Sequence, residues 1–213
     1  MTRLILIRHG ESEANRNSFF AGQMDVELLK KGEEQAKKAA EYIKGNYNVK
    51  KVYASDLKRA YKTGEIIADA LGIEIIKSQS FREIYAGRWQ GETFNNLLKK
   101  YTDDYYVWLN DIGNSCCTDG ESVKELGERV LKELLKVAEE NDDMDIVIAT
   151  HATPIRVVEC ILSGRQLLEM KNVSWVPNAS VTEVLYMDGH LKLEKVGFAE
   201  YLMDLKTEFA ANV

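Results

Sequence analysis

Polar residues that suit phosphate chemistry follow three predicted strands of this chain. Arg8 and His9 come directly after the apolar run Leu4–Ile7, Arg59 opens a helix after a second strand, and His151 ends a third. In an open α/β sheet, ligands bind at the carboxyl ends of parallel strands, so we expect these side chains to meet at one edge. An arginine presents a planar fork to phosphate oxygens, and the start of a helix favours anions. The pattern indicates a phosphate site, although each segment alone is also compatible with a charged turn or a solvated helix face.

The other candidates are a glycine, a carboxylate and the remaining histidine. Gly10 is expected to let the backbone approach a ligand closely. Glu83 follows another β-rich run, and a carboxyl beside a phosphoryl group can protonate a leaving alkoxide and then accept a proton from water. Taken alone, an ordinary surface glutamate is the simpler interpretation. Two of the three histidines end buried strands, whereas His190 lies in a predicted hairpin turn and is assigned no role.

Composition limits the class of protein and the kind of partner. The 213 residues, 45% hydrophobic and 29% charged, fit a single domain over 1–213 with a full core. A net charge of −6 argues against nucleic acid, so the positive charge for a phosphate must be concentrated in one pocket. No apolar stretch approaches the roughly 18 residues of a membrane span, and the N-terminus has no signal-peptide pattern. The three cysteines fit a reducing, cytoplasmic setting and neither a disulfide framework nor a zinc site.

The elements that must position these residues alternate between strand and helix. Strands are expected at Leu4–Ile7, Val49–Ala54, Ile73–Ile76 and Asp145–Thr150, with a hairpin of Val181–Met187 and Leu191–Val196 around Asp188-Gly189. Helices are expected at Leu29–Ile43 with a stop at Gly45, at Leu57–Leu71 with a stop at Gly72, from a capping box at Ser122, and after His151 with Pro154 in its first turn. This order predicts an α/β fold, a three-layer sandwich with a mostly parallel central sheet and helices on both faces. An aromatic-rich segment at about 81–117 is expected to form a small helical cap.

Together these motifs resemble the histidine phosphatase superfamily, which includes the cofactor-dependent phosphoglycerate mutases. The matching segments run through nearly the whole chain: Arg8–Ser12 with Asn15, Phe20–Asp25 with Leu28 and Gly32, Ser55–Ala60 with Thr63, Arg82-Glu83 with Gly87, Trp89 and Gly91, and Gly120–Ser122. Several motifs in the right order are far more specific than any one of them. The chain departs from the family at Thr150-His151-Ala152, where Ser-His-Gly is usual, and at Leu28-Leu29, where a Pro and a Ser or Thr are common.

The resemblance implies a phosphoglycerate mutase-like fold and a role for each candidate residue. His9 would attack phosphorus and become phosphohistidine, and Glu83 would act as general acid and then as base. Arg8, Asn15, Arg59 and His151 would hold the phosphoryl oxygens. Gly22 and Ala152 are the other expected substrate-binding residues. Neither a metal nor a cofactor is implied, because arginines and a histidine supply the positive charge. The expected partner is a small phosphorylated metabolite, and whether the chain is a monomer or a homodimer stays open.

Within this family, the residues after Glu83 favour hydrolysis over mutase chemistry. Mutases have Arg-His-Tyr where this chain has Ile84–Ala86, and they have an arginine pair where Leu109-Asn110 follows Trp108. A site without these contacts holds the dephosphorylated acid poorly, so water takes the phosphoryl group. We therefore expect a metal-independent phosphomonoester hydrolase similar to α-ribazole and broad-specificity phosphatases. The alternatives are a cofactor-dependent phosphoglycerate mutase and a catalytically silent phospho-ligand binding domain. The cap aromatics would either surround an apolar leaving group or form the core of the cap.

Overall fold

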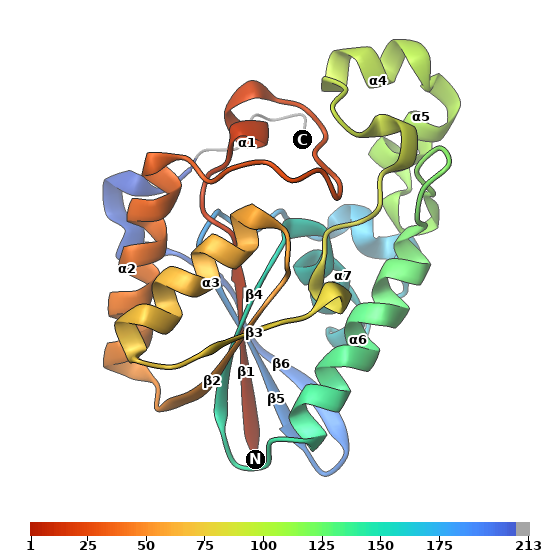
Figure 1. The fold of residues 1–213 in the computed structure, drawn as a ribbon. Coiled ribbons are helices and arrows are strands. Elements are labelled where there is room, and N and C mark those ends of the chain that lie inside the picture. Colours follow the sequence, from red (N-terminus) through yellow and green to blue (C-terminus); the bar gives the residue numbers. More distant parts are fainter. Residues whose placement is uncertain (208–213) are drawn as a thin grey trace.

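The computed structural model describes residues 1–207, which form a central sheet between two layers of helices (Figure 1). The strands are β1 (Thr2–Arg8), β2 (Val49–Ala54), β3 (Ile75–Lys77), β4 (Asp145–Thr150), β5 (Val181–Met187) and β6 (His190–Phe198). Their order across the sheet is β3-β2-β4-β1-β5-β6. The pairs among β3, β2, β4 and β1 are parallel, and β5 is antiparallel to both of its neighbours. The predicted α/β fold with a mostly parallel sheet is therefore confirmed.

The two faces of β1 are covered by different helices. Leu4 and Leu6 pack against α6 (Val123–Glu139) and α7 (Ala152–Leu162), whereas Ile5 and Ile7 pack against α2 (Lys30–Asn46) and α3 (Lys58–Leu71). Successive side chains of a strand point to opposite faces, so a strand covered on both faces is apolar throughout. This is why the N-terminal run is continuous rather than alternating.

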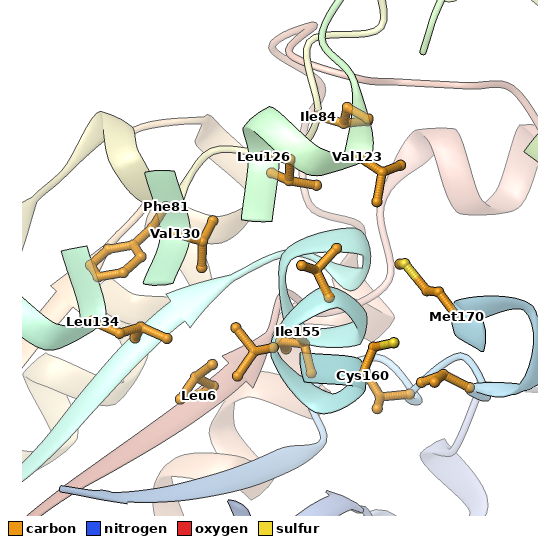
Figure 2. Packing of buried hydrophobic residues seen from close by; sticks show 14 of the residues in the cluster. Leu6, Phe81, Ile84, Val123, Leu126, Val130, Leu134, Ile155, Cys160 and Met170 are labelled. Atoms are coloured by element: carbon orange, nitrogen blue, oxygen red, sulfur yellow. The ribbon is translucent and has the colours of Figure 1, made fainter. Parts of the chain in front are cut away.

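Buried apolar side chains fill the space between the sheet and helices α6 and α7 (Figure 2). Leu126, Val130 and Leu134 form one stripe of α6 that faces Leu6 of β1 and Ile155 of α7. A capping box opens α6, as predicted: the hydroxyl of Ser122 accepts the N–H of Glu125, and the Glu125 carboxylate accepts the N–H of Ser122.

The predicted elements are present, with corrections of one to three residues at many of their ends. The strand predicted at Ile73–Ile76, for example, is β3 at Ile75–Lys77. Gly72 ends α3 in the left-handed region with φ of 69°, and the Asp188-Gly189 turn has φ values of 51° and 81°. The predicted stop at Gly45 is wrong, because α2 continues to Asn46, and its last turn is closed by the N–H of Tyr47 on the carbonyl of Ile43. His190 is the first residue of β6 rather than a turn residue, and it is exposed.

Short helices lie at the end of the molecule toward which β1 runs. They are α1 (Glu13–Asn17), α4 (Phe94–Lys100) and α5 (Thr102–Asn110), all far from the N-terminus (Figure 1). Short 3₁₀ helices occur at Gln79–Phe81, Gly87–Trp89, Ile112–Asn114, Leu167–Asn172 and Glu200–Leu205. No helix within residues 1–207 is long and apolar enough to cross a membrane. The carboxyl ends of the parallel strands therefore open toward α1, α4 and α5.

Candidate active site

The carboxyl ends of β1, β2 and β4 bring the predicted site residues together at one pocket. Seven of the eight residues line it: Arg8, His9, Asn15, Gly22, Arg59, Glu83 and Ala152. The eighth, His151, is fully buried beside the pocket, with its ring centroid 5.2 Å from that of His9. The sheet thus gathers residues from positions 8 to 152 of the chain at one end of the fold.

His9 is held at the end of β1 with one ring nitrogen already engaged. Its backbone N–H donates to the carbonyl of Thr150 at 2.9 Å, which extends the parallel pairing by one residue. Its Nδ1 lies 2.7 Å from the carbonyl oxygen of Gly10, so Nδ1 carries the proton and Nε2 keeps its lone pair. Burial, then the charges of Arg59 and Arg8, lower the pKa of His9 well below its usual value. The ring is therefore neutral at pH 7, with Nε2 as its nucleophilic atom.

The expectation for Gly10 is wrong. A Cβ added at Gly10 would lie 2.3 Å from the carbonyl oxygen of Gly32, so the close approach is to the start of α2 rather than to a ligand. The N–H of Gly10 also donates to the hydroxyl of Thr63 on α3. Gly10 therefore fixes the turn after His9 against two helices.

Two buried arginines supply positive charge beside His9. Arg8 donates through Nη1 to the carbonyl of Val176 at 2.6 Å. Arg59 donates to the carbonyls of Met24 at 2.8 Å and Gly22 at 2.7 Å. Burial lowers the pKa of each guanidinium to about 10, which leaves both cationic at neutral pH. Buried like charges are unfavourable without an anion, so this is the concentrated basic pocket that an acidic protein needs to bind phosphate.

His151 presents a second imidazole with an unsatisfied nitrogen. Its Nε2 lies 2.9 Å from the hydroxyl of the buried Ser55, at the end of β2. Its buried Nδ1 has no hydrogen-bond partner among residues 1–207. Burial is the main cause that lowers the pKa of His151 well below its usual value, and the charge of Arg59 adds to it. A buried polar atom without a partner is uncommon, and it indicates that a ligand atom belongs there.

Glu83 is fixed through both its side chain and its main chain. Its carboxylate accepts the N–H of Ile84 at 2.8 Å and the N–H of Thr153, at the start of α7, at 3.3 Å. Its carbonyl accepts from Gln23 at 3.1 Å and from Arg129 at 2.9 Å. Two carboxylate hydrogen bonds and two carbonyl hydrogen bonds leave little freedom in where this acid points.

The ion pair of Arg129 with Glu121 gives a structural role to the segment Gly120–Ser122, to which the sequence alone assigned none. Arg129, on α6, forms a paired ion bridge to Glu121 at 2.6 and 2.9 Å, and it also donates to the carbonyl of Ser80. Glu121 belongs to the matching segment Gly120–Ser122, but nothing in the sequence distinguishes Arg129 from an ordinary helix arginine. Arg82, the neighbour of Glu83, pairs with Asp56 instead and does not line the pocket.

Asn15, Gly22 and Ala152 complete the predicted set. The Oδ1 of Asn15 accepts from the N–H and the hydroxyl of Ser12, and its Nδ2 has no acceptor in the described part of the chain. Gly22 has φ of 50°, and a Cβ there would lie 2.7 Å from the Cβ of Ala86, so this position requires glycine. Ala152 is the buried first residue of α7.

The rest of the pocket wall was not predicted, and for the cap aromatics the sequence left open whether they line the pocket or form the core of the cap. It consists of Ser12, Ala14, Phe19, Phe20, Ala21, Phe94, Trp108, Thr153 and Trp175. Trp89 and Tyr105, also cap aromatics, are fully buried and form the core of the cap. Within residues 1–207, no three His, Cys, Asp or Glu side chains are placed to hold a metal ion.

Comparison with known proteins gives consistent matches over most of the chain. Residues 4–198 match the model of the histidine phosphatase superfamily, branch 1. Phosphoserine phosphatase 1 of Hydrogenobacter thermophilus is 33% identical over 167 residues, which cover 78% of this chain and 79% of that protein. The structure of Entamoeba histolytica phosphoserine phosphatase in complex with 3-phosphoglyceric acid is similar with a TM-score of 0.82 and 29% identity, covering 95% of this chain and 100% of that one. Bacillus stearothermophilus YhfR, at 21% identity, has the same fold with a TM-score of 0.90 over 95% of this chain and 100% of its own.

Proposed function

The chain belongs to branch 1 of the histidine phosphatase superfamily and is a phosphatase of that family, and we propose that it hydrolyses a small phosphorylated metabolite through a phosphohistidine at His9. The observation that carries the proposal is the neutral His9 ring, with Nε2 available, close to two buried arginines and to His151, whose Nδ1 has no partner among residues 1–207. Such an arrangement suits an attack on phosphorus, because positive groups meet the charge on the phosphoryl oxygens.

The proposed first step transfers the phosphoryl group to the enzyme. Nε2 of His9 forms a bond to phosphorus while the ester P–O bond breaks. The electron pair of that bond goes to the leaving oxygen, which takes a proton from the protonated carboxyl of Glu83. Arg8, Arg59 and the Nδ1 of His151 hold the phosphoryl oxygens, and the Nδ2 of Asn15 is a further donor for them.

The proposed second step returns the enzyme to its starting state. A water attacks phosphorus and gives a proton to the Glu83 carboxylate, the P–N bond breaks, and its electron pair returns to Nε2 of His9. The hydrogen bonds to Ile84 and Thr153 keep the carboxylate in one place through both steps. No metal or cofactor enters either step, because the buried cations carry the phosphoryl charge.

Hydrolysis rather than mutase chemistry is supported by where the residues after Glu83 lie. Ile84 and Ala86 are fully buried in the core, and the N–H of Tyr85 is engaged by Glu121. None of these three residues lines the pocket. A sugar acid released from phosphate therefore finds no polar contacts from this segment.

We also propose that 81–117 is a cap within a single domain over 1–213. Residues 208–213 of that domain lie outside the described residues.

The experiment is a phosphate-release assay over a panel of phosphomonoesters, with 3-phosphoglycerate plus 2,3-bisphosphoglycerate included and 2-phosphoglycerate monitored. We expect phosphate release that falls by about 10⁴-fold or more in His9→Ala, because the nucleophile is lost. His190→Ala, an exposed histidine at the other end of the sheet, is the matched control and should retain activity.

Two outcomes contradict the proposal. Formation of 2-phosphoglycerate with little phosphate released would identify a mutase. Tight phosphate binding without release from any ester would identify a binding domain.

A further inference from the structure

The pocket continues beyond the phosphoryl group into a wall made of apolar side chains. This wall, called the aromatic wall below, consists of Phe19, Phe20, Phe94, Trp108 and Trp175, with Ala14 and Ala21 beside them. Its residues come from the loop after α1, from α4 and α5, and from the loop before β5. Four parts of the chain therefore contribute aromatic surface to one pocket, as is typical of a ligand-binding site.

The aromatic wall is held rigid from behind. The guanidinium of Arg156 lies 4.3 Å from the ring centroid of Trp175. Arg156 is itself buried, and it donates to the carbonyls of Val173 at 2.7 Å and Met170 at 2.9 Å, so it also ties down the loop that carries Trp175. On the other side, the Phe20 ring meets Trp108 edge to face at 5.1 Å. A preorganised flat surface binds a flat group at low entropic cost.

The positive charges of the pocket are all at the end that holds His9, called the phosphoryl end below. Arg8 and Arg59 are the only lysine or arginine side chains in the described wall, and both are buried beside His9. The wall also includes the carboxyl of Glu83, the proposed proton donor to the leaving oxygen. A leaving group with a carboxylate would therefore meet Glu83 and five aromatic rings without a cation of its own, and an unpaired charge removed from water is costly.

We propose that the leaving group of the substrate is an uncharged, apolar group with a flat ring that packs against Trp175, and that the enzyme disfavours O-phosphoserine and 3-phosphoglycerate. This inference rests on the proposed phosphatase function and specifies its substrate class. It separates this chain from the similar proteins named phosphoserine phosphatases, to which it is 30% and 33% identical over the matched residues.

The decisive comparison is kcat/KM for 2-phenylethyl phosphate against O-phosphoserine. Both are esters of primary alcohols, and serine is intrinsically the better leaving group because its ammonium withdraws electrons. A preference for 2-phenylethyl phosphate therefore reports binding rather than reactivity. We expect this preference to be about tenfold or more, as burial of an aromatic group of this size provides.

Trp175→Ala tests the wall itself. The ratio of kcat/KM for 2-phenylethyl phosphate to that for methyl phosphate should fall about tenfold, because only the larger ester reaches Trp175. Tyr106→Ala, an exposed aromatic of α5 outside the pocket, is the control and should leave the ratio unchanged. Trp175→Leu keeps apolar bulk for the loop and should give a smaller fall in the same direction.

The outcomes separate the inference from the function beneath it. Phosphate release that is faster from O-phosphoserine or 3-phosphoglycerate than from 2-phenylethyl phosphate would overturn the inference and leave the phosphatase function standing. An unchanged ratio in both Trp175 variants would do the same. No release from any monoester would overturn the proposed function, and the inference with it.

Discussion

The phosphoryl end of the pocket and its aromatic wall are built in different ways. The phosphoryl end uses residues at strand ends and helix starts. Several of these side chains are fixed by hydrogen bonds to the main chain, as His9 is by Gly10 and Arg59 by Gly22 and Met24. The aromatic wall uses side chains from loops and short helices, and they hold one another by ring contacts, as Phe20 and Trp108 do. The chemistry is thus tied to the sheet, whereas specificity is tied to segments that can change without disturbing it.

The two ends also differ in what they contribute to stability. Burial of the aromatic wall stabilises the fold through the apolar area removed from water. The phosphoryl end lowers the stability of the fold, because its arginines and neutral histidines are buried away from water even when no phosphate is bound. Binding of a phosphate should therefore raise the free energy of unfolding of the protein.

Glu83 lies between the two ends, and its replacement should have the largest effect after loss of the nucleophile. Glu83→Gln keeps the shape but cannot protonate the leaving oxygen, so kcat/KM for 2-phenylethyl phosphate should fall by about 10²- to 10⁴-fold. With 4-nitrophenyl phosphate, whose leaving group needs no proton, the fall should be smaller. Equal losses for both esters, or near wild-type turnover of the alkyl ester, would show that Glu83 is not the proton donor.

Because His9 and His151 are buried in the neutral form, the protein should lose stability in mild acid. The pKa values of His9 and His151 are lowered well below 6.5 by burial first and the nearby arginines second. Below pH 6.5 the unfolded chain therefore binds protons that the folded chain refuses, so stability falls as the pH drops, by up to about 1.4 kcal/mol per pH unit for each histidine. Above pH 6.5 these two groups contribute no slope.

The measurement is the free energy of unfolding by urea at pH 7.5, 6.5 and 5.5. We expect a decrease of roughly 2.7 kcal/mol per pH unit below pH 6.5 at most, and about half that slope in His151→Gln. The carboxyl of Asp56, whose pKa is lowered by its hydrogen bonds to Arg82, loses its contribution only as the pH falls below the ordinary range of an aspartate, outside this window. A flat profile between pH 7.5 and 5.5 would show that the two imidazoles are not buried in solution.

Residues of the phosphoryl end could be predicted from the sequence, whereas residues of the aromatic wall could not. Arg8, His9 and His151 could be predicted because each follows a strong apolar strand signal. Phe19, Phe94 and Trp175 could not, because no periodicity tells which aromatic of a loop or short helix faces a pocket and which packs inside. Trp89 and Trp108 illustrate this limit: both are cap tryptophans, but only Trp108 lines the site.

The errors in the sequence analysis have the same origin. The close approach of Gly10 to Gly32 and the continuation of α2 past Gly45 depend on contacts and hydrogen bonds between residues that the local pattern does not connect. Likewise, the role of Arg129 depends on three carbonyl and carboxylate partners brought to α6 by the fold.

Arg129 is expected to act through Glu83 rather than on the substrate, so its effect should be smaller. Arg129→Met removes a donor from the Glu83 carbonyl and leaves Glu121 unpaired, and a shifted acid should lower kcat/KM for 2-phenylethyl phosphate about tenfold. A purely structural role would affect 4-nitrophenyl phosphate equally, whereas a positioning role should spare it. Arg129→Lys should recover part of the loss, and Lys132→Met, an exposed lysine of the same helix, should have no effect.

Ala152 is where the smallest effect is expected, because its replacement by glycine removes only one methyl group from the pocket lining. It is the first residue of α7, its side chain is a single buried methyl, and the family usually has glycine here. In Ala152→Gly the N–H at the helix start is kept, so kcat/KM for methyl phosphate should change less than about threefold. Stability should fall by about 1 kcal/mol, because a buried methyl and some helix propensity are lost. A tenfold gain in kcat/KM would instead mean that this methyl narrows the phosphoryl end. The chemistry would then no longer be independent of local side-chain choices, and the contrast between the two ends of the pocket would not hold.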